Sequence, residues 1–217
     1  MELMEVSAAA ARLGVTTKQV RRLALEGEID YAARGVVDAT SVEQFLAKRN
    51  ANRARAWSQE TAWAAIDLLS EQDASRLGAS QLSRLHKRLR SINAEELVAL
   101  TRNRAARQEF TAHASSLDEI RSAIIDSSQA EQLLGLVQQQ DVSGYISETH
   151  LGRLVKQFSL IETKRGNVTL RVISESTLIN GKNIVIATAL DLAESLDMRE
   201  RNAGLNALAT ALENFHE

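Results

Sequence analysis

The chain of 217 residues contains neither cysteine nor proline, and only 4% of its residues are aromatic. The lack of cysteine excludes disulfide bonds and thiolate metal sites, and the lack of proline leaves Gly, Asn, Asp and Ser to end helices and form turns. No stretch approaches the run of about 18 apolar residues that a membrane-spanning helix needs. The acidic start does not have the layout of a signal peptide. We therefore expect a cytoplasmic protein with no membrane partner.

The overall composition is typical of a globular protein, but the charge is unevenly distributed. Hydrophobic residues make up 44% of the chain, charged residues 25%, and the net charge is -2. Residues 1–107 hold about 17 Lys and Arg against 13 Asp and Glu, whereas residues 108–217 hold about 9 against 15. The first half therefore suits an approach to phosphate, and the second half would on average be repelled by DNA.

Residues 5–46 have the spacing of a helix-turn-helix followed by a wing. Ser7 is a suitable N-cap for a first helix, and Gly14 stands where that helix must end, because Gly tolerates the left-handed conformation. Thr16 and Gln19 have the spacing of a capping box at the start of a second, basic helix. A short helix, a Gly turn and a capped basic helix are what a recognition helix in the DNA major groove requires.

The segment after the second helix predicts a wing and a third helix. A tight turn at residues 32–35 is flanked by Ile29 and Tyr31 on one side and by Val36 and Val37 on the other, which is typical of a two-stranded hairpin. Thr40 then has the position of a cap for a helix through Phe45. The residues that we expect to contact DNA are Thr17, Lys18, Arg21 and Arg22 on the second helix, Arg34 at the wing tip, and Arg53 and Arg55 in the basic segment that follows. The alternative is a small helical cap and a linker whose basic residues are ordinary solvated surface.

The rest of the chain predicts a helical middle and an acidic C-terminal part. Ser58 is suited to start one helix and either Ser91 or Asn93 another, and the closely spaced Trp57 and Trp63 indicate a packing cluster. Residues 158–173 alternate around a polar turn, which predicts a β-hairpin that two last helices would cover. The predicted fold is mainly α with short β-hairpins, and its parts are a winged helix-turn-helix (1–48), a basic linker and helical region (49–107) and an acidic α+β domain (108–217).

Patterns for catalysis and for metal or cofactor binding are weak. The four histidines are dispersed, none lies at a metal-ligand spacing, and the chain has no Gly-rich phosphate loop. Asp191 and Glu194 lie three residues apart on a predicted helix, where a solvated or capping pair is more common than an acid–base pair. We therefore expect no enzymatic activity, no catalytic residues, no cofactor and no metal.

Two resemblances bear on function. The order of elements in about the first 48 residues resembles the small winged domains of excisionases and MerR-type regulators. Together with that start, five further segments make the chain similar to actinobacterial proteins of the AbiEi-like antitoxin type. These segments are Trp57–Trp63, Leu85–Arg90, Asn167–Val172, Ala189–Ser195 and Arg199–Leu205. The resemblance implies a regulator of a type IV toxin–antitoxin operon whose toxin partner is a nucleotidyltransferase.

Three functions follow as hypotheses. The first is a repressor that binds double-stranded operator DNA, silences its own operon and acts as the antitoxin of a type IV pair. The second is a one-component or phage-type regulator whose C-terminal domain binds a ligand or a protein. The third is an interaction protein that does not bind DNA. The leucine stripe at residues 82–92 is too short to favour a coiled-coil dimer over packing within the chain, so the oligomeric state stays open.

Overall fold

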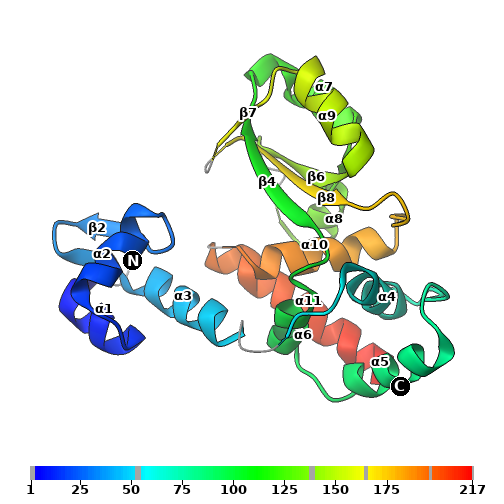
Figure 1. The fold of residues 1–217 in the computed structure, drawn as a ribbon, viewed down its shortest axis with the longest axis horizontal. Helices are drawn as coiled ribbons and strands as arrows, with labels where there is room; N and C mark the ends of the chain where they lie inside the picture. The colour runs from blue at the N-terminus through cyan, green and yellow to red at the C-terminus, as the bar shows by residue number, and fades with distance from the viewer. Residues whose placement is uncertain (1–2, 52–54, 137–139, 164–165, 196, 217) are drawn as a thin grey trace. The chain divides into compact units, whose positions relative to one another are not determined.

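A computed structural model describes residues 3–51, 55–136, 140–163, 166–195 and 197–216, with the backbone alone for residues 44 and 47–51. Over these ranges the fold is mainly α-helical with short β-strands, as the sequence predicts (Figure 1). The chain divides into two compact units, Met1–Arg55 and Ala56–Glu217. Among the helices so described, none is both long and apolar enough to cross a membrane.

The N-terminal unit combines short helices with a small antiparallel sheet. Its elements are β1 (Leu3–Glu5), α1 (Val6–Leu13), α2 (Thr17–Leu25), β2 (Tyr31–Ala33), β3 (Val36–Asp38) and α3 (Ala39–Ala51). β2 and β3 form the hairpin that the sequence predicts, and β1 adds a strand to the other side of β3, giving the order β1-β3-β2. The apolar sides of all three helices meet the hairpin in one core, which includes Leu13, Val20, Val37 and Val42.

Local capping determines where the first two helices end. Gly14 closes α1 in the left-handed conformation with φ 65°, and Gly27 follows α2 with φ 76°. The hydroxyl of Thr16 accepts a hydrogen bond from the backbone N–H of Gln19 at 3.2 Å, which confirms Thr16 as the N-cap of α2. The turn between α1 and α2 is therefore determined by residues within it.

Two other capping predictions are wrong. α1 begins two residues earlier than predicted, after Glu5, and Ser7 lies in its first turn, where its hydroxyl donates to the Glu5 carboxylate at 3.1 Å. α3 is capped by Asp38, whose carboxylate accepts from the backbone N–H groups of Thr40 at 3.4 Å and Ser41 at 3.3 Å. Asp38 ends β3 and starts α3, so a strand residue performs the capping that the sequence pattern assigned to Thr40.

The C-terminal unit contains a five-stranded mixed sheet and two groups of helices. Its strands are β4 (Ala106–Thr111), β5 (Ile125–Asp126), β6 (Val142–Ser147), β7 (Ile161–Glu162) and β8 (Val168–Ile173). Its helices are α4 (Gln59–Leu69), α5 (Ala79–Leu89), α6 (Ala94–Thr101), α7 (Leu117–Ser122), α8 (Ser128–Leu133), α9 (Glu148–Gln157), α10 (Asn183–Ala193) and α11 (Met198–His216), with a 3-10 turn at Ala114–Ser116. The sheet order is β5-β6-β8-β4-β7, in which β6 and β8 are parallel and the other neighbours are antiparallel.

The hairpin predicted over residues 158–173 is wrong. β7 pairs with β4, with Phe110 opposite Glu162, and β8 lies between β4 and β6. β4 thus separates the two strands that were expected to pair. The alternation of β8 correctly predicts a strand with one buried face, but alternation does not specify which strand lies beside it.

The two faces of the central strands are covered by different elements. Val168, Leu170 and Val172 of β8 belong to an apolar cluster that packs under α7 and α9 (Figure 1). Between them, Thr169 and Arg171 point to the opposite face, because successive side chains in a strand alternate. α10 packs against that opposite face, so the unit has a polar contact layer between β8 and α10.

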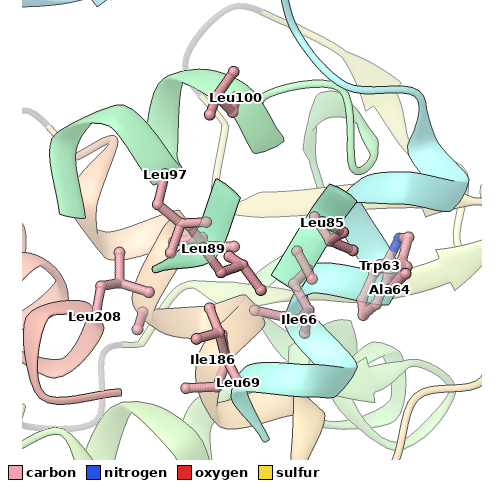
Figure 2. Packing of buried hydrophobic residues seen from close by; sticks show 14 of the residues in the cluster. Trp63, Ala64, Ile66, Leu69, Leu85, Leu89, Leu97, Leu100, Ile186 and Leu208 are labelled. Carbon is pink, nitrogen blue, oxygen red and sulfur yellow. The ribbon is translucent and has the colours of Figure 1, made fainter. Parts of the chain in front are cut away.

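The main core of the C-terminal unit lies among α4, α5, α6, α10 and α11. Figure 2 shows Trp63 and Ile66 of α4 packed with residues that include Leu89 of α5 and Leu208 of α11. Trp63 is fully buried and Trp57 packs against the same cluster, which confirms the predicted packing role of the two tryptophans. Because this one core spans residues 63–212, and the expected boundary between residues 107 and 108 falls inside β4, the helical middle and the acidic part form a single unit.

Candidate functional site

The exposed side of α2 is basic. The predicted contact residues on this helix, all exposed, are Thr17, Lys18, Arg21 and Arg22. The opposite side of the helix is buried through Val20 and Leu23, at 0% and 7% exposure. The first turn of α2 has no acidic residue, so the positive end of the helix dipole is not neutralised by its own sequence. The structure therefore places these four predicted residues on one solvent-facing helix.

The remaining predicted contacts lie outside α2. Arg34 is exposed in the tight turn between β2 and β3, next to Gly35, whose φ of 84° makes that turn possible. Arg55 is exposed after α3, and Arg53 lies outside the described residues. The hairpin tip and the helix thus belong to the same compact unit.

Leu25 is an exposed residue of α2 that the sequence did not single out. It is 84% exposed, and it lies three, four and seven residues after Arg22, Arg21 and Lys18. This spacing places Leu25 on the same side of the helix as the three cations. On such a surface the apolar side chain is suited to contact the edges of bases, and the cations are suited to contact phosphates.

A second concentration of charge lies inside the C-terminal unit. Asp191 of α10 accepts hydrogen bonds from Arg104 on Oδ1 at 2.5 Å and from the Tyr145 hydroxyl on Oδ2 at 2.8 Å. Its Oδ1 also forms an ion pair with Nε of Arg171 at 2.7 Å. Arg104 also forms a two-pronged contact with Glu194, at 2.9 and 3.0 Å. The side chains of Arg104, Arg171 and Asp191 are at most 9% exposed. The prediction that Asp191 and Glu194 form a solvated or capping pair is therefore wrong.

Two groups of this network, Tyr145 and Glu194, have shifted pKa values. Burial, followed by the charge of Asp191, raises the pKa of Tyr145 well above its usual value, so the phenol stays protonated and donates to Asp191. Burial tends to raise the pKa of Glu194, but the charge and hydrogen bonds of Arg104 outweigh it and the net pKa is lowered. Groups so strongly biased toward one state suit a structural connection between sheet and helix better than proton transfer.

The sequence contains one indirect indication of this network. Arg171 stands in the middle of the apolar strand Val168–Ile173, and a charged residue inside a buried strand needs a partner. The partner itself was not predictable, because Arg104 and Asp191 are 87 residues apart in the sequence. Asp67 has a similar arrangement, with Arg76 at 2.7 Å and the side-chain amide of Asn183 at 3.0 Å.

A polar cavity of about 180 Å³ lies beside the network. It is lined by residues of β4, β6, β8, α8, α10 and the start of α11, including Ser143, Thr169 and Thr188. Thr188 is 1% exposed, and its hydroxyl has no hydrogen-bond partner in the structure as described. Glu131 lines the same cavity, and burial, with the charges of Asp126 and Glu200, raises the pKa of its carboxyl group.

The histidines do not form a site. The ring of His86 packs against Phe215 with ring centres 5.3 Å apart, and His113 and His150 each contact a nearby serine hydroxyl at 2.7 Å. Within the described ranges, no three His, Asp or Glu side chains are grouped so that they could hold a metal ion. The two places at which chemistry concentrates are therefore the basic side of α2 and the polar cavity.

Comparison with known proteins gives no relative. No protein-family model, curated protein or solved structure matches the chain. The kinship with AbiEi-like antitoxins and with small winged regulators stays a prediction from sequence resemblance. Function must therefore be inferred from the surfaces of the two units.

Proposed function

We propose that the N-terminal unit is a winged helix-turn-helix domain that binds duplex DNA, and that the protein is a sequence-specific transcriptional repressor. The observation that carries the proposal is the exposed set Thr17, Lys18, Arg21 and Arg22 on a helix whose other side is buried. Such a helix can enter the major groove while its apolar side stays attached to the core of the unit.

The chemistry of the side chains assigns them different tasks. Arg21 has the planar donor set that pairs with both acceptors of a guanine edge, and Thr17 and Lys18 lie nearest the helix start, where base contacts concentrate. Arg34 at the hairpin tip contacts the DNA backbone or the minor groove. The unit carries nine Lys and Arg against seven Asp and Glu, so its attraction to DNA depends on where its cations lie more than on net charge.

The resemblance to AbiEi-like antitoxins extends this proposal to a physiological setting. In that setting the repressed operon is the protein's own, and the neighbouring gene encodes a nucleotidyltransferase toxin. This part of the proposal rests on the sequence resemblance, and DNA binding by α2 does not depend on it. The antitoxin role is tested separately from DNA binding by asking whether expression of the chain restores growth to cells that express the neighbouring gene.

The direct test of DNA binding compares two sets of basic residues in the full chain. Fluorescence anisotropy is measured with a labelled duplex from upstream of the protein's own gene and with a shuffled duplex of equal length. One variant replaces Lys18, Arg21 and Arg22 with Ala. The matched control replaces Arg84, Lys87 and Arg88, three exposed cations on α5, and so changes the net charge equally.

We expect the α2 variant to lose binding to the upstream duplex and the α5 variant to retain it. Circular dichroism establishes that both variants fold, since all six side chains are exposed. Equal losses in the two variants would mean that binding follows net charge and not α2. No binding by the unaltered chain to the upstream duplex would refute the proposal.

A further inference from the structure

An apolar cavity lies among α4, α10 and α11 of the C-terminal unit. Its volume of about 510 Å³ is within the range of about 300–1,000 Å³ that is usual for the sites of small organic ligands. Six of the residues that line it are apolar: Leu68 and Leu69 of α4, Ile186 of α10, and Ala207, Ala211 and Phe215 of α11. The cavity lies wholly within one compact unit, so it does not depend on DNA binding by α2.

Small residues on α11 account for the space. Ala207 and Ala211 are four residues apart and lie on the same side of the helix, and Phe215 continues that side by a further turn. The cavity also reaches Leu69 and Ile186, which are only 7% and 9% exposed and belong to the main core (Figure 2). The two alanines leave the space beside these core residues unfilled, so the cavity has an apolar floor.

Polar residues lie at the mouth of this cavity. Glu71, Thr210 and Asn214 line it and are exposed, whereas its floor is buried. Among the lining residues that the structure describes, Glu71 alone is charged, and no hydrogen bond or ion pair joins its carboxylate to any described residue. An ionised carboxylate only accepts hydrogen bonds, so a ligand group that binds there must be a donor.

The backbone holds Glu71 in an unfavourable conformation. Its φ of 56° is left-handed, a conformation that favours Gly, and it directly follows Ser70, the C-cap of α4. The next residue, Gln72, is held by its backbone N–H, which donates to the carbonyl of Asp67 at 2.8 Å. Its side-chain amide also exchanges hydrogen bonds with that of Asn180, at 2.8 and 2.7 Å. Residues other than Gly that are kept in such conformations cluster at ligand sites.

We propose that this cavity binds a small molecule that has an apolar body and one hydrogen-bond donor, an alcohol or an amine. The body packs on the apolar floor and the ring of Phe215, where it is removed from water, and the donor binds the carboxylate of Glu71. A carboxylic acid of the same shape is disfavoured, because its carboxylate would meet that of Glu71 with no cation in the described lining to pair with it. Arg90 and His86 contact the ring of Phe215 but do not line the cavity.

The test is isothermal titration of the full chain with three probes that share a naphthalene ring and a short side chain: naphthylethanol, naphthylethylamine and naphthylacetate. The alcohol and the amine distinguish a neutral from a charged donor, and the acetate carries only an acceptor. Ala211→Leu places an apolar side chain in the cavity and so competes with the ligand body.

A second variant, Glu71→Gly, removes the carboxylate and supplies the residue that the left-handed position favours. Its matched control is Ser159→Gly. Ser159 has a φ of 50° directly after Phe158, the C-cap of α9, so it has the same conformation at the same position of a helix, and it does not line the cavity. Both Gly variants should raise the midpoint of thermal unfolding, because both remove a strained backbone conformation.

We expect the alcohol and the amine to bind, and naphthylacetate to bind at least about tenfold more weakly, which corresponds to the loss of a hydrogen bond to a charged group. Glu71→Gly should weaken binding of the alcohol and the amine by a similar factor and so remove the difference between the three probes. Ala211→Leu should abolish binding, and Ser159→Gly should leave it unchanged. Circular dichroism of each variant establishes that the fold is retained.

Two kinds of result would overturn the proposal. No binding of the alcohol or the amine, or binding that is retained in Ala211→Leu, would mean that the cavity is not a ligand site. An affinity for naphthylacetate equal to that for the other two probes, or an unchanged affinity in Glu71→Gly, would mean that Glu71 does not select a hydrogen-bond donor.

Discussion

The guanidinium of Arg171, in the middle of strand β8, lies 2.7 Å from the carboxylate of Asp191 on α10. The same carboxylate is 2.5 Å from Arg104, which follows α6, and Arg104 in turn binds Glu194. Two guanidinium groups and two carboxylates thus balance at the contact between sheet and helix. The charges in this contact balance, and its geometry is also fixed: Arg104 donates hydrogen bonds to both carboxylates, and the Tyr145 hydroxyl donates to the second oxygen of Asp191.

Replacing Asp191 with Asn should destabilise the protein strongly. The change leaves the buried Arg104 and Arg171 with one carboxylate between them, and breaking a buried pair typically costs about 3–5 kcal/mol. Urea unfolding followed by circular dichroism measures the free energy of unfolding. The exposed control Glu213→Gln should change it by less than about 0.5 kcal/mol. A loss of similar size in both variants would contradict the structural role of Asp191.

The crossing of α10 and α11 should not tolerate a side chain at Gly204. A Cβ there would meet the backbone oxygen of Ala189 and the backbone nitrogen of Ala193 at 2.5 Å each. We expect Gly204→Ala to lower the free energy of unfolding by about 1–3 kcal/mol. Gly152→Ala in α9, where nothing lies within 4 Å of the added atom, should raise it by about 0.5–1 kcal/mol. Stabilisation by both changes would mean that the helices are farther apart.

The pair of Glu194 with Arg104 should make stability depend on acidity. The pKa of Glu194 is lowered in the folded state, so its contribution is present above its usual pKa and is lost as the pH falls through the lowered value. The difference in unfolding free energy between the unaltered chain and Glu194→Gln should therefore be constant near neutrality and shrink in acid. A difference that does not change with pH would show that Glu194 is not charged in the folded protein.

Features determined by neighbouring residues were predictable from the sequence. Gly14 ends the first helix and Thr16 starts the second as expected, and Ser58 caps a helix where predicted. Of the two predicted caps Ser91 and Asn93, Asn93 caps α6. Each of these signals acts within about four residues, so no knowledge of the rest of the chain is needed. The exposed positions of Lys18, Arg21, Arg22 and Arg34 follow from the same local patterns.

Features that depend on distant residues were not predictable. Residues 158–173 alternate as strands do, yet β4 lies between β7 and β8 because the sheet order is set by packing of the whole unit. The pairing of Asp191 with Arg104, and the cavity beside Thr188, require segments about 80 residues apart to meet. The boundary expected after residue 107 does not separate two compact units, because one core joins residues from both sides of it. The distribution of charge along the chain does not indicate which helices share a core.

DNA affinity should fall steeply with salt. If Lys18, Arg21, Arg22 and Arg34 neutralise about four phosphates, log K should fall with log salt with a slope near -3.6, at about -0.9 per contact. Anisotropy titrations at several potassium chloride concentrations measure this slope. Replacing Lys18 alone with Ala should reduce the magnitude of the slope by about 0.9, the value of one contact. Replacing the exposed Lys87 on α5 should leave the slope unchanged. An affinity that does not change with salt would contradict phosphate contact.

The most direct test of α2 as a recognition helix compares Arg21→Ala with Arg34→Ala on operator and random duplexes of equal length. Arg21→Ala should weaken operator binding by about 1–3 kcal/mol, with a smaller effect on random DNA, because a lost base contact reduces sequence preference. Arg34→Ala should weaken binding to both duplexes equally, because the hairpin tip contacts the backbone or the minor groove. If both variants lose the same affinity on operator and on random DNA, α2 does not recognise sequence.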